Sequence, residues 1–261
     1  MYWKYGIGVE QRGLFGAEAA NYTGGVMMHL RWIEESEVGG LLLRAIAREV
    51  LSAPPGNLRA FTDPVAPGQP TRGVLIRPYH EGKCNATENS ALVEYTPWMQ
   101  KPCSHFWTSP AKNRGFLPHE ILFHELVHAL RDAAGHGWSL TPLTGALKRY
   151  HNTEEFIAVV TTNIYMTDPS NKRADRVGLR KDHTKGKLEN EFSDSLEFFK
   201  VSTDVFRNIE QFCKEDPWFT SRLAEVPSTF NPVNSYYHKQ AEARSNSNSL
   251  RAILRDAVPV S

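Results

Sequence analysis

Three residues in one short segment have the types and spacing needed to bind a metal ion and to activate water. They are His124, Glu125 and His128, within the sequence His-Glu-Leu-Val-His. Residues four apart lie on the same side of a helix, so both imidazoles can face one metal ion. Glu125 is turned about 100° from His124, which suits a base that acts on water better than a ligand. This arrangement is typical of zinc-dependent peptide hydrolysis.

The surrounding sequence predicts a buried helix for this motif. Pro118 suits the first turn of the helix, and Gly135 suits its end. Between them, apolar residues recur at helical spacing: Ile121, Leu122, Phe123, Leu126, Val127, Ala129 and Leu130. Two histidines and a glutamate are costly to bury without partners, so a shared metal explains them better than a solvated surface does. His119, five residues before His124, falls on a different side of the helix.

A third metal ligand is expected from a second helix over residues 152–165, with Asn152 as its N-cap. Glu155 lies in the first turn, and the small side chain of Ala158 would allow a close approach to the first helix. Two alternatives are open, since Glu155 could close a capping box on the backbone of Asn152 or interact only with the helix dipole. Spacing alone favours Glu155 over Glu154 only modestly.

The two segments together resemble the gluzincin pattern HExxH…E-F-[FI]-A. This pattern occurs in the catalytic domain of anthrax lethal factor and in MtfA-type peptidases. A longer stretch, residues 115–183, is similar to NleD-type effector metallopeptidases of bacteria. The resemblance implies a zinc endopeptidase that cuts a protein substrate, with Zn²⁺ held by His124, His128 and Glu155.

Further roles follow from this resemblance. Glu125 is expected to act as the general base. Tyr150 and His183 are candidates for the donor that stabilises the oxyanion, although a half-buried tyrosine and a surface histidine are the ordinary alternatives. Asp132 and Asn163 have suitable chemistry to hold the ligand imidazoles by their other ring nitrogens. Asp132 could equally be a solvated residue near the end of its helix.

The pattern of elements along the chain predicts an α+β protein, and the resemblance implies a zincin-like metallopeptidase domain. A small mixed sheet is expected to pack on the HExxH helix and the second ligand helix, followed by C-terminal helices. We assign residues 1–200 to this domain and residues 201–261 to a C-terminal helical extension packed on it. The composition of the tail, rich in Ser and Asn, is typical of a disordered segment.

Local patterns place the other elements. Strands are expected near residues 3–10, 74–78 and 91–95, a helix is expected near residues 41–51, and residues 26–33 suit either. Two alternatives are open for residues 91–95. They could form a sheet edge that pairs with an extended substrate, or an internal strand.

Composition limits the classes of function. The chain has 261 residues, of which 41% are apolar and 23% charged, as in an ordinary globular protein. Its net charge of +1 argues against nucleic acid as the main partner. No apolar stretch approaches the roughly 18 residues of a membrane span, and the first residues lack the pattern of a cleavable signal peptide.

Cysteine usage does not predict a disulfide framework. The three cysteines, Cys84, Cys103 and Cys213, are odd in number and widely separated. Cys84 and Cys103 could meet in space, but buried free thiols are the favoured interpretation.

These features leave two hypotheses from different classes. The favoured one is a secreted bacterial zinc metalloprotease that acts as an effector or toxin in virulence. It would be monomeric and translocated into a target cell without a cleavable signal, or else would stay in the cytoplasm. The alternative is a degenerate metal-binding module that acts by partner binding. Within the enzyme class, a housekeeping MtfA-like regulatory peptidase is a further possibility.

Overall fold

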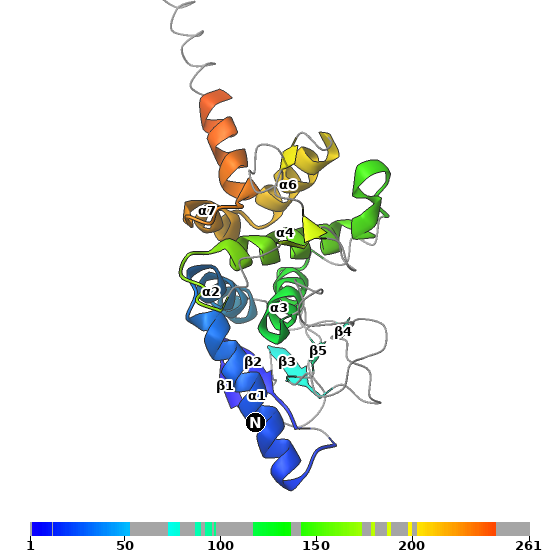
Figure 1. Cartoon of the computed structure of the whole chain (residues 1–261), viewed down its shortest axis with the longest axis vertical. Helices are drawn as coiled ribbons and strands as arrows, with labels where there is room; N and C mark the ends of the chain where they lie inside the picture. The colour runs from blue at the N-terminus through cyan, green and yellow to red at the C-terminus, as the bar shows by residue number, and fades with distance from the viewer. Residues whose placement is uncertain are drawn as a thin grey trace, which may run out of the picture.

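The protein combines a small mixed β-sheet with a larger set of helices, which confirms the α+β class. A computed structural model of the chain describes residues 2–11, 13–52, 73–78, 87–89, 92–95, 97, 117–136, 142–173, 179–180, 187–188, 198–199 and 203–243. In Figure 1 the sheet and α4 lie on opposite sides of α3. None of the described helices combines the length and apolar character needed to cross a lipid bilayer.

The sheet has five strands in the order β1-β2-β3-β5-β4. The strands are β1 (Tyr2–Lys4), β2 (Ile7–Val9), β3 (Val74–Arg77), β4 (Thr87–Asn89) and β5 (Leu92–Glu94). The three central strands, β2, β3 and β5, are parallel, whereas β1 and β4 are antiparallel to their neighbours. The sheet is therefore mixed, as expected.

Residues 3–10, expected to start as a strand, do so and form most of a hairpin. Lys4 pairs with Ile7, which leaves Tyr5 and Gly6 as a two-residue turn. Both have positive φ, 57° and 72°, and this backbone conformation matches the twist of the flanking strands. The chain therefore reverses here and pairs β1 with β2.

The strand expected near residues 91–95 lies inside the sheet. β5 pairs with β3 on one side and with β4 on the other, which confirms the internal alternative. β4 is the edge strand on this side, and both β4 and β5 contact α3. An extended peptide could therefore pair with β4 but not with β5.

Three helices form the centre of the molecule: α1 (Gly16–Glu34), α2 (Glu37–Ser52) and α3 (Pro118–Ala133). Both α1 and α2 pack against α3. Their apolar sides and the central strands share one core, which includes Ile7, Val9, Val26, Ile33, Leu42, Ile46, Val74, Ile76, Leu122, Phe123, Leu126 and Val127. This core fixes α3, and with it the HExxH motif, on several sides.

Two histidines are part of this core between α1 and α3. Nδ1 of His29 lies 2.8 Å from Oη of Tyr95, which donates a hydrogen bond to the carbonyl of Pro118. Burial lowers the pKa of both His29 and His119 to about 4, so both are neutral. His119 is thus a core residue on another side of α3, as its spacing from His124 predicts.

The second half of the chain covers α3 from the other side. It contains the short 3₁₀ helix η1 (Gly145–Tyr150), α4 (Thr153–Thr167), β6 (Leu179–Arg180), β7 (Lys187–Leu188), α6 (Thr203–Glu215), α7 (Pro217–Glu225) and a helix over residues 232–243. α6 packs on α4, and α7 packs on α2. These contacts are compatible with a packed C-terminal extension, but the boundary at residue 200 stays a prediction.

The cysteines can be followed only in part. Cys213 is a buried free thiol, as expected. Cys84 and Cys103 lie outside the described residues.

Because α1 and α2 approach closely, we expect alanine substitution to destabilise the protein much more at one of two neighbouring glycines than at the other. A Cβ at Gly39 would lie 1.9 Å from the carbonyl oxygen of Ile33, whereas the nearest atom to a Cβ at Gly40 is Nη1 of Arg44, at 3.2 Å. We expect Gly39→Ala to lower the free energy of unfolding by about 2–3 kcal/mol, because backbone must move. Gly40→Ala should change it by less than about 1 kcal/mol, because the flexible Arg44 side chain at 3.2 Å and the carbonyl oxygen of Glu34 at 3.3 Å need to shift only slightly. Urea unfolding measures both, and equal small effects would contradict this packing.

Candidate metal centre

α3 begins and ends where its sequence predicts. Pro118 occupies the first helical position, and Gly135 has a φ of 78° just beyond the last turn. The N–H of Gly135 donates to the carbonyl of Asp132, and the N–H of His136 donates to the carbonyl of Arg131. These two bonds form a Schellman motif, which satisfies carbonyls that the helix leaves unpaired.

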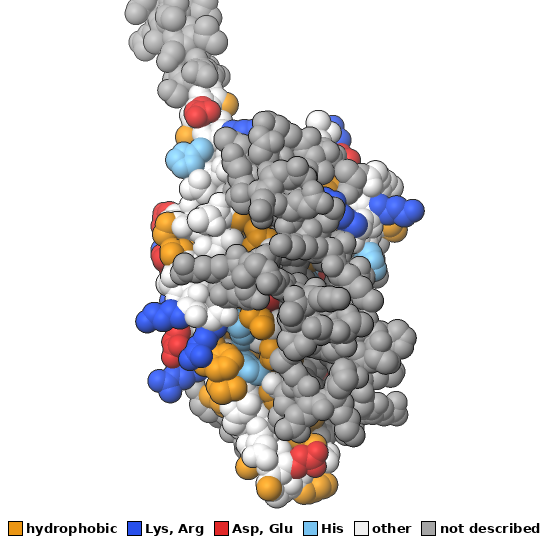
Figure 2. Space-filling view, in the orientation of Figure 1, with side chains coloured by type: hydrophobic (Ala, Val, Ile, Leu, Met, Phe, Trp, Pro, Cys, Tyr) orange, Lys and Arg blue, Asp and Glu red, His pale blue; other side chains and the backbone are white. Residues whose placement is uncertain are grey.

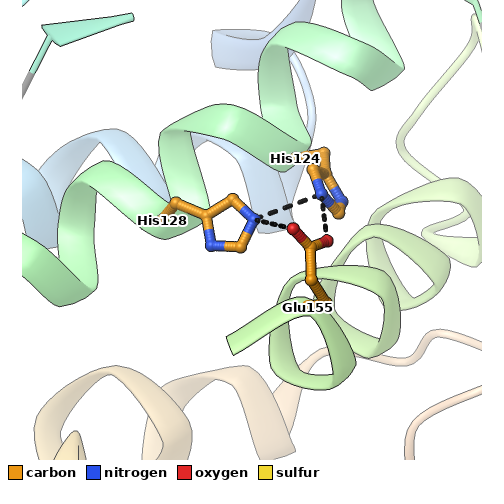
Figure 3. Close-up of side chains that lie close together, drawn as sticks. All are labelled: His124, His128 and Glu155. Atoms are coloured by element: carbon orange, nitrogen blue, oxygen red, sulfur yellow. Dashed lines mark hydrogen bonds and ion pairs between the residues drawn. The ribbon is translucent and has the colours of Figure 1, made fainter. Parts of the chain in front are cut away.

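The imidazoles of the motif face a carboxylate from α4. Figure 3 shows His124 and His128 of α3 converging on Glu155 of α4. The two Nε2 atoms are 3.2 Å apart. Oε2 of Glu155 lies 3.3 Å from Nε2 of His124, and Oε1 lies 3.7 Å from Nε2 of His128. Among the described residues, this is the only group of three or more His, Cys, Asp or Glu side chains placed to share a metal ion.

Two of these separations, 3.2 and 3.3 Å, approach those expected in a tetrahedral zinc site, whereas the 3.7 Å separation goes to the other oxygen of the same carboxylate. With bonds of about 2.0–2.1 Å, the ligand atoms of such a site lie about 3.3–3.4 Å from one another. Both histidines are buried, whereas the side chain of Glu155 is 13% exposed. This donor set of two nitrogens and one carboxylate could therefore hold a metal ion. The two Nε2 atoms are also close enough for a direct hydrogen bond between the imidazoles. A measurement of metal binding distinguishes these two arrangements.

The turn before α4 directs the carboxylate of Glu155 away from the helix cap. Oδ1 of Asn152 accepts a hydrogen bond from the N–H of Glu155, which confirms Asn152 as the N-cap. The reciprocal bond of a capping box is replaced, because the N–H of Asn152 donates to the carbonyl of Tyr150. This tight γ-turn gives His151 a φ of 65° and a ψ of −60°, a rare and strained conformation. The carboxylate of Glu155 contacts the two histidines.

Glu154 has a different partner from Glu155. Its two carboxylate oxygens accept hydrogen bonds from Nε and Nη2 of Arg131, at 2.6 and 2.9 Å. Arg131 also contacts Asp216 and Glu215, at the junction of α6 and α7. Glu154 is therefore committed to an ion pair, and the geometry selects Glu155 as the candidate third ligand.

The other candidate site residues have mixed outcomes. Glu125 is partly exposed on α3 and follows the ligand His124 directly. Tyr150 is buried, and its ring packs edge-on against Phe156, so its proposed role at an oxyanion stays a prediction. Asp132 is partly exposed and Asn163 is buried in α4, and their roles as partners of the ligand imidazoles also stay predictions. His183 lies outside the described residues.

Sequence reasoning missed Arg131. It lies three residues after His128 and seven after His124, so all three fall on one side of α3. That spacing was the available signal. A buried arginine with three carboxylate partners could not be recognised from it, because two of the partners lie more than eighty residues away.

A separate pocket of about 730 Å³ lies between β1 and α1. Its lining includes Met28 and Trp32, and the guanidinium of Arg173 lies 4.6 Å from the centre of a ring of Trp32. In Figure 2, hydrophobic and basic side chains lie next to one another on the face of the molecule shown. None of the three candidate ligands lines this pocket, so the pocket and the candidate metal centre are separate features.

Comparison with known proteins adds no relatives. No protein-family model, no curated protein and no solved structure matches this chain. The assignment of the site therefore depends on its own geometry.

The two glutamates at the start of α4 should differ in zinc affinity. Glu155→Gln is expected to weaken zinc binding by at least about a hundredfold, because it removes a charged ligand. Glu154→Gln keeps all three candidate ligands and should weaken binding less. Competition with a chromophoric chelator measures both affinities, with circular dichroism to confirm folding. If Glu154→Gln loses more affinity than Glu155→Gln, the third ligand is misassigned.

Proposed function

We propose that the protein is a zinc-dependent endopeptidase with a zincin-like arrangement, which hydrolyses a peptide bond in a protein substrate. The observation that carries the proposal is the convergence of His124, His128 and Glu155 from two packed helices. Glu125 completes the set of groups that such a reaction requires. The resemblance of these residues to the gluzincin pattern points to the same chemistry.

His124, His128 and Glu155 would hold the zinc ion, and Glu125 would move the proton. A zinc ion bound there would supply Lewis acidity, which lowers the pKa of water and polarises the scissile carbonyl. Glu125 would accept the proton of the attacking water and then deliver it to the leaving amine. The partial exposure of Glu125 and Glu155 supports access of both water and a substrate to this side of α3.

The sheet offers a place for the substrate backbone. β4 is an edge strand, contacts α3, and has one side without a partner strand in the described sheet. An extended peptide could add to this edge through backbone hydrogen bonds. An extended chain with its scissile bond beside α3 would suit an endopeptidase.

The biological setting remains part of the proposal. The resemblance to NleD-type effectors favours a secreted bacterial effector or toxin with a protein target. A housekeeping MtfA-like peptidase would use the same chemistry on a different substrate. A module that only binds metal would bind zinc without cleaving any protein.

If Glu125 is the general base, its substitution should greatly slow peptide cleavage without affecting zinc binding. Glu125→Gln should bind zinc as the wild type does, yet lose about 10²- to 10⁴-fold in the rate of cleavage. The measurement is mass spectrometry of new protein N-termini in cell lysates treated with the zinc-loaded protein. Glu18→Gln, which changes an exposed glutamate in α1, is the matched control and should cleave normally. Unchanged cleavage by Glu125→Gln would rule out the mechanism, and zinc binding without cleavage by the wild type would favour a binding module.

A further inference from the structure

We infer that Arg131 is a positioning residue that holds Glu155 against the two histidines and makes the metal centre depend on the C-terminal helices. The inference rests on the metal-binding part of the proposed function and is independent of peptide hydrolysis. It starts from a buried side chain that the proposed chemistry does not use. Arg131 is 2% exposed and belongs to the same helix as the histidines.

One side of α3 carries both the histidines and Arg131. His124, His128 and Arg131 are spaced by four and then three residues, which aligns them along the helix. All three meet the first turn of α4, the histidines through Glu155 and Arg131 through Glu154. Two neighbouring glutamates of α4 thus have two neighbouring sets of partners on α3.

The pair formed by Arg131 and Glu154 has the geometry of a rigid clamp. Nε donates to one carboxylate oxygen and Nη2 to the other, so the planar guanidinium and the carboxylate lie fork to fork. Such bidentate pairs fix orientation as well as distance. Because Glu154 precedes Glu155 directly, the clamp sets the position of the ligand along α3 without touching the metal.

The same guanidinium reaches the C-terminal helices. Nη1 donates to Oδ2 of Asp216, and Nη2 donates to Oε2 of Glu215 at 2.6 Å. Nε2 of His136, placed by the Schellman motif, lies 3.3 Å from Oδ1 of Asp216. Asp216 is the residue before α7, so the junction of α6 and α7 is tied to the end of α3.

The charges of this cluster are mutually dependent. Burial disfavours the charged guanidinium, but the hydrogen bond and charge of Glu154, together with the charge of Asp216, raise the pKa of Arg131 overall. The hydrogen bond that the His136 imidazole donates to Asp216 likewise raises the pKa of His136. The carboxylates of Glu154, Glu215 and Asp216 share one arginine, so removal of one carboxylate changes the electrostatic interactions of the other two. A change at Asp216 should therefore reach Glu154, and through it Glu155.

Coupling of this kind is reciprocal. If docking of the junction between α6 and α7 favours the metal-binding arrangement, zinc must favour docking by the same factor. Zinc should therefore slow hydrogen exchange in α6 and α7, although neither helix supplies a candidate ligand. A network that only stabilises the fold would leave the geometry of the bound metal unchanged.

The test compares zinc affinity and cobalt spectra in the full chain. The variants are Asp216→Asn, Arg131→Lys and Arg131→Met, and the control is Arg77→Met. Arg77 lies in the sheet, where its Nε and Nη2 both donate to Oε1 of the partly buried Glu94. Zinc affinity is measured by competition with a chromophoric chelator, and the d–d spectrum of bound Co²⁺ reports ligand geometry.

We expect Asp216→Asn to weaken zinc binding by about tenfold and Arg131→Met by about a hundredfold, with an altered Co²⁺ spectrum in both. Arg131→Lys should recover part of the affinity, since it keeps the charge but not the fork. Arg77→Met should bind zinc like the wild type. If Arg131→Met does not fold, Asp216→Asn and Arg131→Lys decide the outcome.

Wild-type affinity and an unchanged spectrum in folded Asp216→Asn and Arg131→Lys would overturn the inference while leaving the peptidase proposal intact. If these variants lose zinc affinity as expected but the wild type cleaves no protein, the inference holds and the peptidase proposal is overturned. Failure of the wild type to bind zinc would overturn both.

Discussion

The contact between the first turn of α4 and one side of α3 is the interaction on which the rest of the structure depends. Two consecutive glutamates point to two different partners there. Glu155 meets a pair of imidazoles, and Glu154 meets a guanidinium. Three nitrogen and oxygen donors can share a metal ion only if the two helices keep this offset. The candidate metal centre thus depends on how the two helices pack, because its residues come from two separate segments.

The remaining elements keep the two helices in place. The sheet and the helices α1 and α2 hold α3 through a continuous apolar core, in which close packing leaves little room for movement. On the other side, α6 packs on α4, and the junction between α6 and α7 is bonded to Arg131. A chain of rigid contacts therefore runs from the sheet through α3 to the C-terminal helices, with the candidate site in its middle.

Local signals predicted much of this arrangement. The HExxH spacing, Pro118, Gly135 and the N-cap Asn152 each act over a few residues, and the structure bears out the elements they mark. The features that were missed depend on distant or unusual partners. The turn at Tyr5 and Gly6 lacks the common Asn-Gly pair. The role of Arg131 was missed because two of its three carboxylate partners lie far along the chain. The zincin-like arrangement itself stays an inference from motif and geometry.

Zinc-edge spectroscopy of the zinc-loaded protein, combined with anomalous diffraction from its crystals, tests the central claim most directly. The account predicts one zinc ion per chain, bonded at about 2.0–2.1 Å to Nε2 of His124 and of His128 and at about 2.0–2.2 Å to a carboxylate oxygen of Glu155. Zinc at another position, or a zinc-saturated crystal in which these side chains contact only one another, would contradict it.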